Sequence, residues 1–239
     1  MKKIILLFIS FTLAQTFAQQ ISGPELLRKS IQFHDPEGNW ETFQGTLQVM
    51  MKIPDKPSRN STISIDLPNQ YFYLKAIQEE KITEYTLDKE SCWIKFNQET
   101  PTEAEKLANK LSCDRAKMYR DYYTFLYGLP MKLNDPGTII HEQVILKNFQ
   151  GNEYLVLKVT YQKEVGEDTW YFYFHPETYA MEVYQFYHDE DKNDGEYIIL
   201  SEIETVQGIK MPKKRDWYYN HNDQFIGTDL LWFFYEKRI

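Results

Sequence analysis

The sequence predicts a mainly β (α+β) fold of about 11 antiparallel strands, interrupted once by a helical segment. Apolar and polar residues alternate along many short segments that are separated by turn residues, which is typical of strands joined in a meander. Between residues 100 and 128 the apolar residues instead recur at helical spacing. Regular alternation before and after a single change of period therefore indicates two runs of strands joined by a helix.

The first 18 residues have the pattern of a signal peptide. Lys2 and Lys3 precede an apolar run, Ile4 to Leu13, and a small-x-small cleavage pattern ends at Ala18. The run is shorter than a typical membrane-spanning helix. An uncleaved membrane anchor is the alternative. We expect cleavage after Ala18, a periplasmic or secreted location with no transmembrane span, and a single β-rich domain over residues 19–239.

The chain is acidic, with 35 Asp and Glu against 27 Lys and Arg and a net charge of −8. An acidic surface repels phosphate backbones, so nucleic acid is not expected as a partner. One basic cluster stands out, formed by Lys210, Lys213, Lys214 and Arg215. We interpret it as a solvated turn, and an anion or lipid-headgroup site is the alternative.

Cys92 and Cys113 are the only cysteines. In an exported protein an even count allows one disulfide, and two buried free thiols are the alternative.

The predicted strands are short segments in which large apolar or aromatic residues recur at every second position. They are residues 47–53, 63–67, 71–77, 81–87, 92–96, 144–149, 153–162, 170–175, 179–188, 196–206, 210–219 and 225–235. Trp170, Phe172 and Phe174 lie on the opposite strand face from Tyr171 and Tyr173. Because large residues occur on both faces, we expect a helix, a lid or a ligand to cover the second face.

Three helices are predicted from start and stop signals. The first spans Gln20 to Ser30 with Ser22 as N-cap, and the second begins at a capping box formed by Thr100 and Glu103. The third begins near Ser112 or Asp114 and is aromatic on most sides. We expect it to end at Tyr127, with Gly128 as a left-handed cap.

No sequence motif predicts catalysis, a metal site or a cofactor. The loop from Asp189 to Gly195 partly matches a calcium loop, but its twelfth position is Leu200, so we interpret it as an acidic turn. Carboxylates on strands that also carry aromatic residues could form a catalytic pair, so a hydrolase is an alternative function. The candidates are Glu182, Glu202, Glu204 and Asp229.

Two stretches, Arg120–Thr138 and Gly208–Leu231, resemble a family of exported bacterial proteins that is catalogued as a domain of unknown function. The order of signal peptide, strands, helical excursion and strand meander is more distantly similar to the lipoprotein-carrier (LolA/LolB-like) fold. That resemblance implies an antiparallel, unclosed half-barrel of about 11 strands with a helical lid on its concave face. It also implies binding of acyl chains.

The function expected is non-catalytic binding or carriage of a hydrophobic ligand, a lipid or a lipoprotein acyl chain, by a monomer. A hydrolase using strand carboxylates and an envelope interaction module are the alternatives. Aromatic and apolar residues of the third helix and of two later strands are expected to contact the ligand. They are Tyr119, Tyr122, Tyr123, Phe125, Leu126, Trp170, Phe172, Phe174, Tyr184 and Phe186.

Overall fold

The computed structural model of the chain describes residues 21–232. The predicted signal peptide, and the predicted end of the last strand at Tyr235, lie outside these residues. Within them, strands make up a single antiparallel sheet. The twelve strands are β1 Gln44–Lys52, β2 Arg59–Asp66, β3 Tyr71–Gln78, β4 Lys81–Asp88, β5 Ser91–Phe96, β6 Thr138–Phe149, β7 Asn152–Tyr161, β8 Thr169–Phe174, β9 Met181–Tyr187, β10 Glu196–Val206, β11 Ile209–Tyr219 and β12 Phe225–Trp232.

The strand order is β5-β4-β3-β2-β1-β12-β11-β10-β9-β8-β7-β6. Two meanders are thus joined at the middle, where β1 pairs with β12 and Val49 lies opposite Leu231. The edge strands β5 and β6 do not pair with each other, so the sheet is unclosed. The mainly β fold is confirmed, and each predicted strand segment overlaps one of the twelve strands.

Three α-helices accompany the sheet: α1 (Gly23–His34), α2 (Glu103–Asn109) and α3 (Cys113–Gly128). Ser22 caps α1 and Ser112 caps α3 by accepting a backbone hydrogen bond, as expected, but α1 continues past Ser30 to His34. The capping box of α2 is formed by Thr102 and Glu105, two residues later than predicted. The side chain of Thr102 accepts from the backbone three residues on, while Glu105 reaches back, so both donors are satisfied there.

The predicted left-handed cap at Gly128 is wrong. Gly128 is the last residue of α3, and the following Leu129 has extended dihedral angles. Gly128 is instead required by packing, because a Cβ atom there would lie 2.3 Å from Cζ2 and 2.5 Å from Cε2 of Trp40. The glycine thus allows the end of the helix to approach a buried indole ring.

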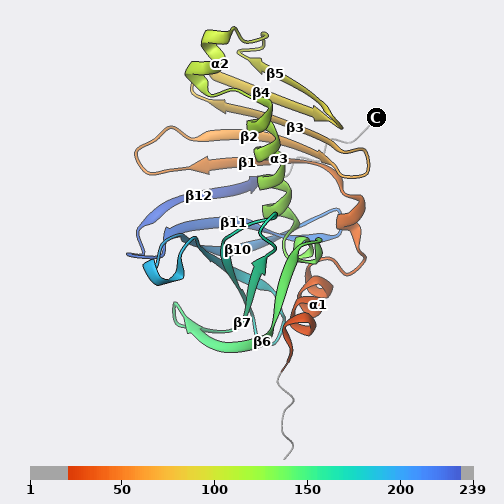
Figure 1. The fold of residues 1–239 in the computed structure, drawn as a ribbon, viewed down its shortest axis with the longest axis vertical. Helices are drawn as coiled ribbons and strands as arrows, with labels where there is room; N and C mark the ends of the chain where they lie inside the picture. Colours follow the sequence, from red (N-terminus) through yellow and green to blue (C-terminus); the bar gives the residue numbers. More distant parts are fainter. Residues whose placement is uncertain (1–20, 233–239) are drawn as a thin grey trace, which may run out of the picture.

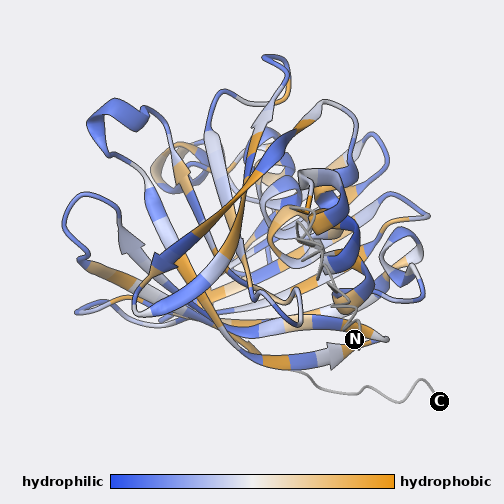
Figure 2. Ribbon diagram, turned by 90° about the horizontal axis from the view of Figure 1, so that it is seen from below, coloured by the Kyte–Doolittle hydropathy of each residue, from blue (hydrophilic) through white to orange (hydrophobic). Residues whose placement is uncertain are grey.

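The sheet curves around α3, which runs from β4 and β5 across the strands toward β10 (Figure 1). Seen from below, hydrophilic and hydrophobic residues alternate along several of the strands (Figure 2). Alternate residues of both meanders bury their side chains against α3 and α1 in one continuous core, which includes Leu47, Ile63, Leu74, Tyr127 and Phe172. The helix on the concave face of an unclosed sheet is the arrangement that the resemblance implied.

The second face of β7, β8 and β9 is covered by another segment of the same chain. The cover expected on that face is therefore provided by the protein itself. Tyr173 is fully buried, and the ring centroid of Phe149, at the end of β6, lies 5.0 Å from its ring. Phe149 also lies 5.2 Å from the ring of Tyr197 on β10. The end of the β6–β7 hairpin therefore packs over the second row of tyrosines.

His34 joins α1 to two strands. Its Nδ1 donates to the carbonyl oxygen of Lys210 at 2.7 Å, and its Nε2 accepts from the backbone N–H of Met181 at 2.9 Å. This pattern requires the neutral imidazole, because a protonated Nε2 would face a donor. Burial lowers the pKa of His34 from 6.5 to about 4.

We expect His34 to make stability fall in acid. Because its pKa is lowered in the folded state, the unfolded state binds the proton first, and stability is lost as the pH falls from 6.5 toward 4. Between pH 7.5 and pH 5 the loss from this residue should be about 2 kcal/mol. Urea unfolding of the parent and of His34→Gln at both pH values measures it, since the carboxylates titrate in both proteins. Equal losses in the two proteins would contradict the assignment.

Candidate functional site

Helix α3 is fixed to the concave face at three points along its length. A disulfide joins Cys113, its first residue, to Cys92 on β5. Midway, Arg59 on β2 donates from Nη2 to the hydroxyl of Tyr123 at 3.0 Å. Near its end, Arg215 on β11 donates from Nη2 to the carbonyl oxygen of Leu126 at 3.2 Å. The last contact satisfies a carbonyl that has no partner within the helix.

The predicted helix residues divide between two sides of α3. Tyr123 and Leu126 are buried, and the ring of Tyr119 lies 5.7 Å from that of Tyr85 on β4. Phe125 faces the other meander, where its ring lies 5.3 Å from Trp170 on β8. The helix therefore fills the space between the two halves of the sheet.

The predicted strand residues lie together on the concave face. Phe172, Phe174 and Tyr184 are buried, whereas Trp170 and Phe186 are only partly buried. The Trp170 ring lies 4.9 Å from Phe186 and 5.9 Å from Phe172. The most exposed of these rings are thus next to one another and next to Phe125, at the boundary between helix and strands.

Tyr122 is the most exposed aromatic residue of α3. Its ring lies 5.1 Å from that of Tyr123, and burial of its hydroxyl raises its pKa, as do the charges of Asp229 and Tyr184. Yet 39% of Tyr122 remains exposed. Of the five predicted residues on α3, Tyr122 is therefore the one that is most open to solvent.

A row of charged residues crosses the sheet beneath α3. Strand register places Arg59 opposite Met51, Met51 opposite Asp229, and Asp229 opposite Arg215, on β2, β1, β12 and β11. Directly opposite residues in antiparallel strands have neighbouring side chains on one face. Arg215 is 1% exposed and Asp229 is 8% exposed, so this row belongs to the interior.

The expectation that Arg215 lies in a solvated turn is wrong. The four basic residues belong to β11, and the alternation of the strand puts Arg215 on the same face as Trp217. That alternation was the signal in the sequence that could have separated Arg215 from the neighbouring lysines. Lys214 lies on the other face, where it pairs with Asp216 at 2.6 Å.

Each of the two arginines makes fewer hydrogen bonds than its guanidinium group can donate. Arg215 also donates from Nη1 to the carbonyl of Pro212 at 3.0 Å, and its guanidinium lies 4.2 Å from the centroid of the Tyr127 ring. The Nε atoms of Arg59 and Arg215 are buried, and neither has a hydrogen-bond partner among the described residues. Buried donors of this kind are normally paired with protein, water or a ligand.

Asp229 is the carboxylate of this row. Burial raises its pKa, and Arg215, Arg59 and the nearby indole N–H of Trp217 oppose that rise. Among the described residues no ion pair within 4.0 Å joins Asp229 to either arginine. The opposite charges are neighbours but are not in direct contact.

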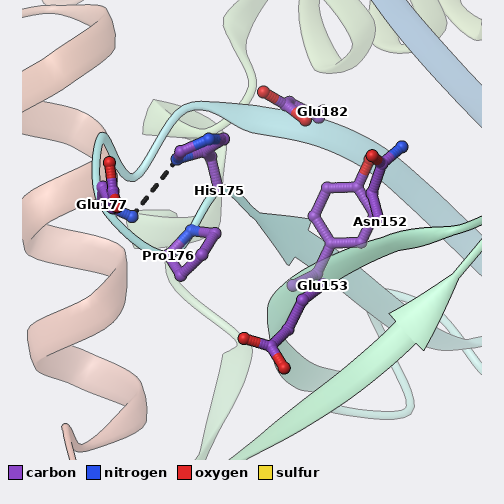
Figure 3. Close-up of a pocket in the computed structure, with 7 residues that line it drawn as sticks. Asn152, Glu153, His175, Pro176, Glu177 and Glu182 are labelled. Carbon is purple, nitrogen blue, oxygen red and sulfur yellow. Dashed lines mark hydrogen bonds between the residues drawn. The ribbon is translucent and has the colours of Figure 1, made fainter.

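The four carboxylates considered for a hydrolase do not gather. Glu202 and Glu204 lie near the end of β10, where Glu202 has a left-handed backbone and is passed over in the pairing with β11. Glu182 lines a surface pocket of about 250 Å³ with Glu153, His175 and Glu177. Figure 3 shows Glu182 and Glu153 at opposite ends of that pocket, and His175 accepting from the backbone of Glu177. Of the four, only Asp229 is buried.

The acidic turn after β9 uses its carboxylates locally. Asp194 accepts from the backbone N–H groups of His188 and Asp189, and Asp189 accepts from Asp191. Over residues 21–232 no group of three His, Cys, Asp or Glu side chains is placed to hold a metal ion. None of the helices in that range is both long enough and apolar enough to cross a membrane.

A family model matches residues 2–232, which is nearly the whole chain. The chain belongs to the family of unknown function DUF6503. The resemblance to a family known only as a domain of unknown function is therefore confirmed. No curated protein matches the sequence.

Several solved structures are similar to the chain, at low sequence identity. A LolA superfamily protein from Nitrosomonas europaea aligns over 89% of this chain and 92% of its own, with a TM-score of 0.48 and 8% identity. A putative outer membrane lipoprotein-sorting protein domain from Vibrio parahaemolyticus covers 87% and 89%, with a TM-score of 0.46 and 9% identity. A DUF1329 family protein from Desulfovibrio piger covers 89% and 92%, with a TM-score of 0.46 and 10% identity.

Proposed function

We propose that this member of the DUF6503 family is a periplasmic or secreted, non-catalytic carrier that binds a lipid or acyl chain between α3 and strands β8 and β9. The observation that carries the proposal is the group of half-exposed aromatic residues on facing elements. Phe125 comes from the helix, and Trp170 and Phe186 come from the strands. Tyr122, also on the helix, is 39% exposed. Apolar sites of this kind, with a few polar groups at one end, are typical of small-molecule binding.

The way in which α3 is attached to the sheet is compatible with entry of an acyl chain beside the helix. Cys113 holds the N-terminus of the helix to the edge strand β5, whereas its other end is held through a hydrogen bond from Arg215 and packing against Trp40. A covalent tie at one end lets the rest of the helix move away from β8 and β9 without leaving the sheet. Entry of a chain would then exchange ring contacts between Phe125 and Trp170 for contacts with the ligand.

Trp170→Ala tests the position of the site. Loss of a large ring that contacts the ligand should weaken binding of a fluorescent fatty acid by about tenfold, since the ring carries roughly 1.5 kcal/mol or more of apolar contact. Fluorescence titration of the purified protein without its leader measures the dissociation constant. Trp93→Ala is the matched control, because Trp93 is 54% exposed on β5 and points away from the face that holds Cys92.

Native mass spectrometry after gentle purification provides the independent test, with co-purified lipid as the expected result. A parent protein that carries no lipid and does not bind the fluorescent fatty acid would overturn the carrier function. Equal weakening by Trp170→Ala and Trp93→Ala would overturn the location of the site.

A further inference from the structure

The charged row beneath α3 has more positive than negative charge. Arg59 and Arg215 carry two positive charges, and Asp229 is the one carboxylate in this row, where both arginines oppose the rise of its pKa that burial causes. Glu196 is another acid on this face, where it lies opposite Phe186, and its pKa responds to burial and to His188. Buried charges are costly unless they are compensated, so one positive charge in this row lacks a counter-charge.

Unpaired donors point to the same conclusion. Besides the Nε atoms of the two arginines, the hydroxyl of Tyr184 is buried without a hydrogen-bond partner among the residues described. Tyr184 is 1% exposed, and burial raises its pKa, an effect that the charge of Arg215 opposes and that of Asp229 reinforces. A group of buried donors that share one neighbourhood can bind an oxyanion, because each oxygen atom accepts several hydrogen bonds.

Strand register connects this charged row to the aromatic residues of the proposed ligand site. Trp217, two residues beyond Arg215, lies opposite Ile198, which in turn lies opposite Tyr184. Tyr184 lies opposite Phe172, and the next row contains Trp170 and Phe186. An apolar chain that lies along β8 and β9 would therefore have its end beside Arg215, and Asp229 lies between Arg215 and Arg59 in the strand register.

We propose that Arg59 and Arg215 bind the anionic head group of the ligand, which makes the ligand a singly charged amphiphile with a carboxylate or phosphate at one end. The inference rests on the proposed function, because it assigns the polar end of the same site. In the empty protein Asp229 partly compensates the arginines, and the head group supplies the second negative charge. Arg215 has a structural role as well, through its contacts with Leu126 and Pro212.

The test compares ligands that differ only in the head group. Oleate, oleyl alcohol and 1-oleoyl-lysophosphatidylglycerol, each below its micellar concentration, displace the fluorescent fatty acid from the parent protein. We expect oleate to bind about tenfold more tightly than oleyl alcohol, the effect of one charge-assisted hydrogen-bonded contact. The phosphate ligand separates the two head-group chemistries, since whichever anion binds more tightly identifies the head group that the site prefers.

Two variants then shift the ratio of oleate to alcohol affinity in opposite directions. Arg59→Met should bring the ratio toward one, and Arg59 is suited to the test because it lies at the start of β2 and is only partly buried. Asp229→Asn should raise the ratio, because it removes the negative charge that competes with the head group. Arg28→Met is the control, since the side chain of Arg28 is 67% exposed on α1.

The outcomes separate this inference from the function on which it rests. Equal affinity for both anions and the alcohol would overturn the head-group assignment and leave the carrier function standing. A ratio that is unchanged in both Arg59→Met and Asp229→Asn would also overturn it. Failure of all three ligands to bind would overturn the proposed function itself.

Discussion

Gly128→Val is expected to lower the free energy of unfolding by on the order of 3 kcal/mol, because it forces side-chain atoms into a packed indole. The added Cβ would lie 2.3 Å from Cζ2 of Trp40, far inside a van der Waals contact. Trp40 is 6% exposed and stacks on Phe43 at 5.3 Å, and its backbone N–H donates to Asp35. The indole thus has little room to move, so the end of α3 must shift instead. Urea unfolding monitored by circular dichroism measures the loss.

A double-mutant cycle separates this cause from a backbone effect. Gly128→Ala should lower the free energy of unfolding much less in a Trp40→Leu background than in the parent, because the indole ring that would clash with the new Cβ atom is absent. Gly166→Ala is the matched control, since the nearest atom to a Cβ there is 3.7 Å away in Tyr161. If Gly128→Ala lowers the free energy of unfolding by the same amount with and without the indole, the close approach to Trp40 is not the reason that this position requires glycine.

Removal of the disulfide is expected to cost about 3 kcal/mol, the value of the chain-entropy model for a loop of this length. Cys92 and Cys113 are 21 positions apart in the sequence, and the loop between them contains α2. The expected result for the double variant Cys92→Ala, Cys113→Ala is a lower midpoint in urea. Faster hydrogen exchange at the N-terminal end of α3 should accompany it, because that end loses its tie to β5.

Reduction of the parent protein provides the control for this variant. With excess dithiothreitol present throughout, parent and double variant should unfold at nearly the same urea concentration. If the oxidised parent is no more stable than the double variant, the bond does not stabilise the native state, and α3 is held by Arg59, Arg215 and its apolar contacts alone.

Local patterns in the sequence were sufficient to predict the elements. Alternation along segments such as 153–162 depends only on which side chains are large and apolar, so it predicted the strands correctly. The N-caps Ser22 and Ser112 were identified for the same reason, since a cap is made by residues that are close in sequence. The capping box of α2 was displaced by two residues because Thr100 and Thr102 each offer the same pattern with an acid three residues on.

The faces that these elements present were decided by the tertiary structure. Tyr173 was correctly predicted to need a cover, but only the folded chain shows that Phe149, 24 residues earlier, provides it. The aromatic residues proposed to contact a ligand are gathered on the concave face, yet Phe172 and Phe174 are fully buried there by the protein's own side chains. Alternation identifies a buried face and does not say what fills the space in front of it.

The sequence by itself determined a mainly β chain with one aromatic helix, because strand and helix periods are local properties. Only the tertiary structure decided that Gly128 meets Trp40, and that Arg59, Asp229 and Arg215 share one row. These residues are far apart in the chain, and their contacts depend on the pairing of β1 with β12, which brings the first strand of the sheet beside the last. No local pattern in the sequence specifies that pairing. The charged row could therefore be recognised only from the register of the paired strands.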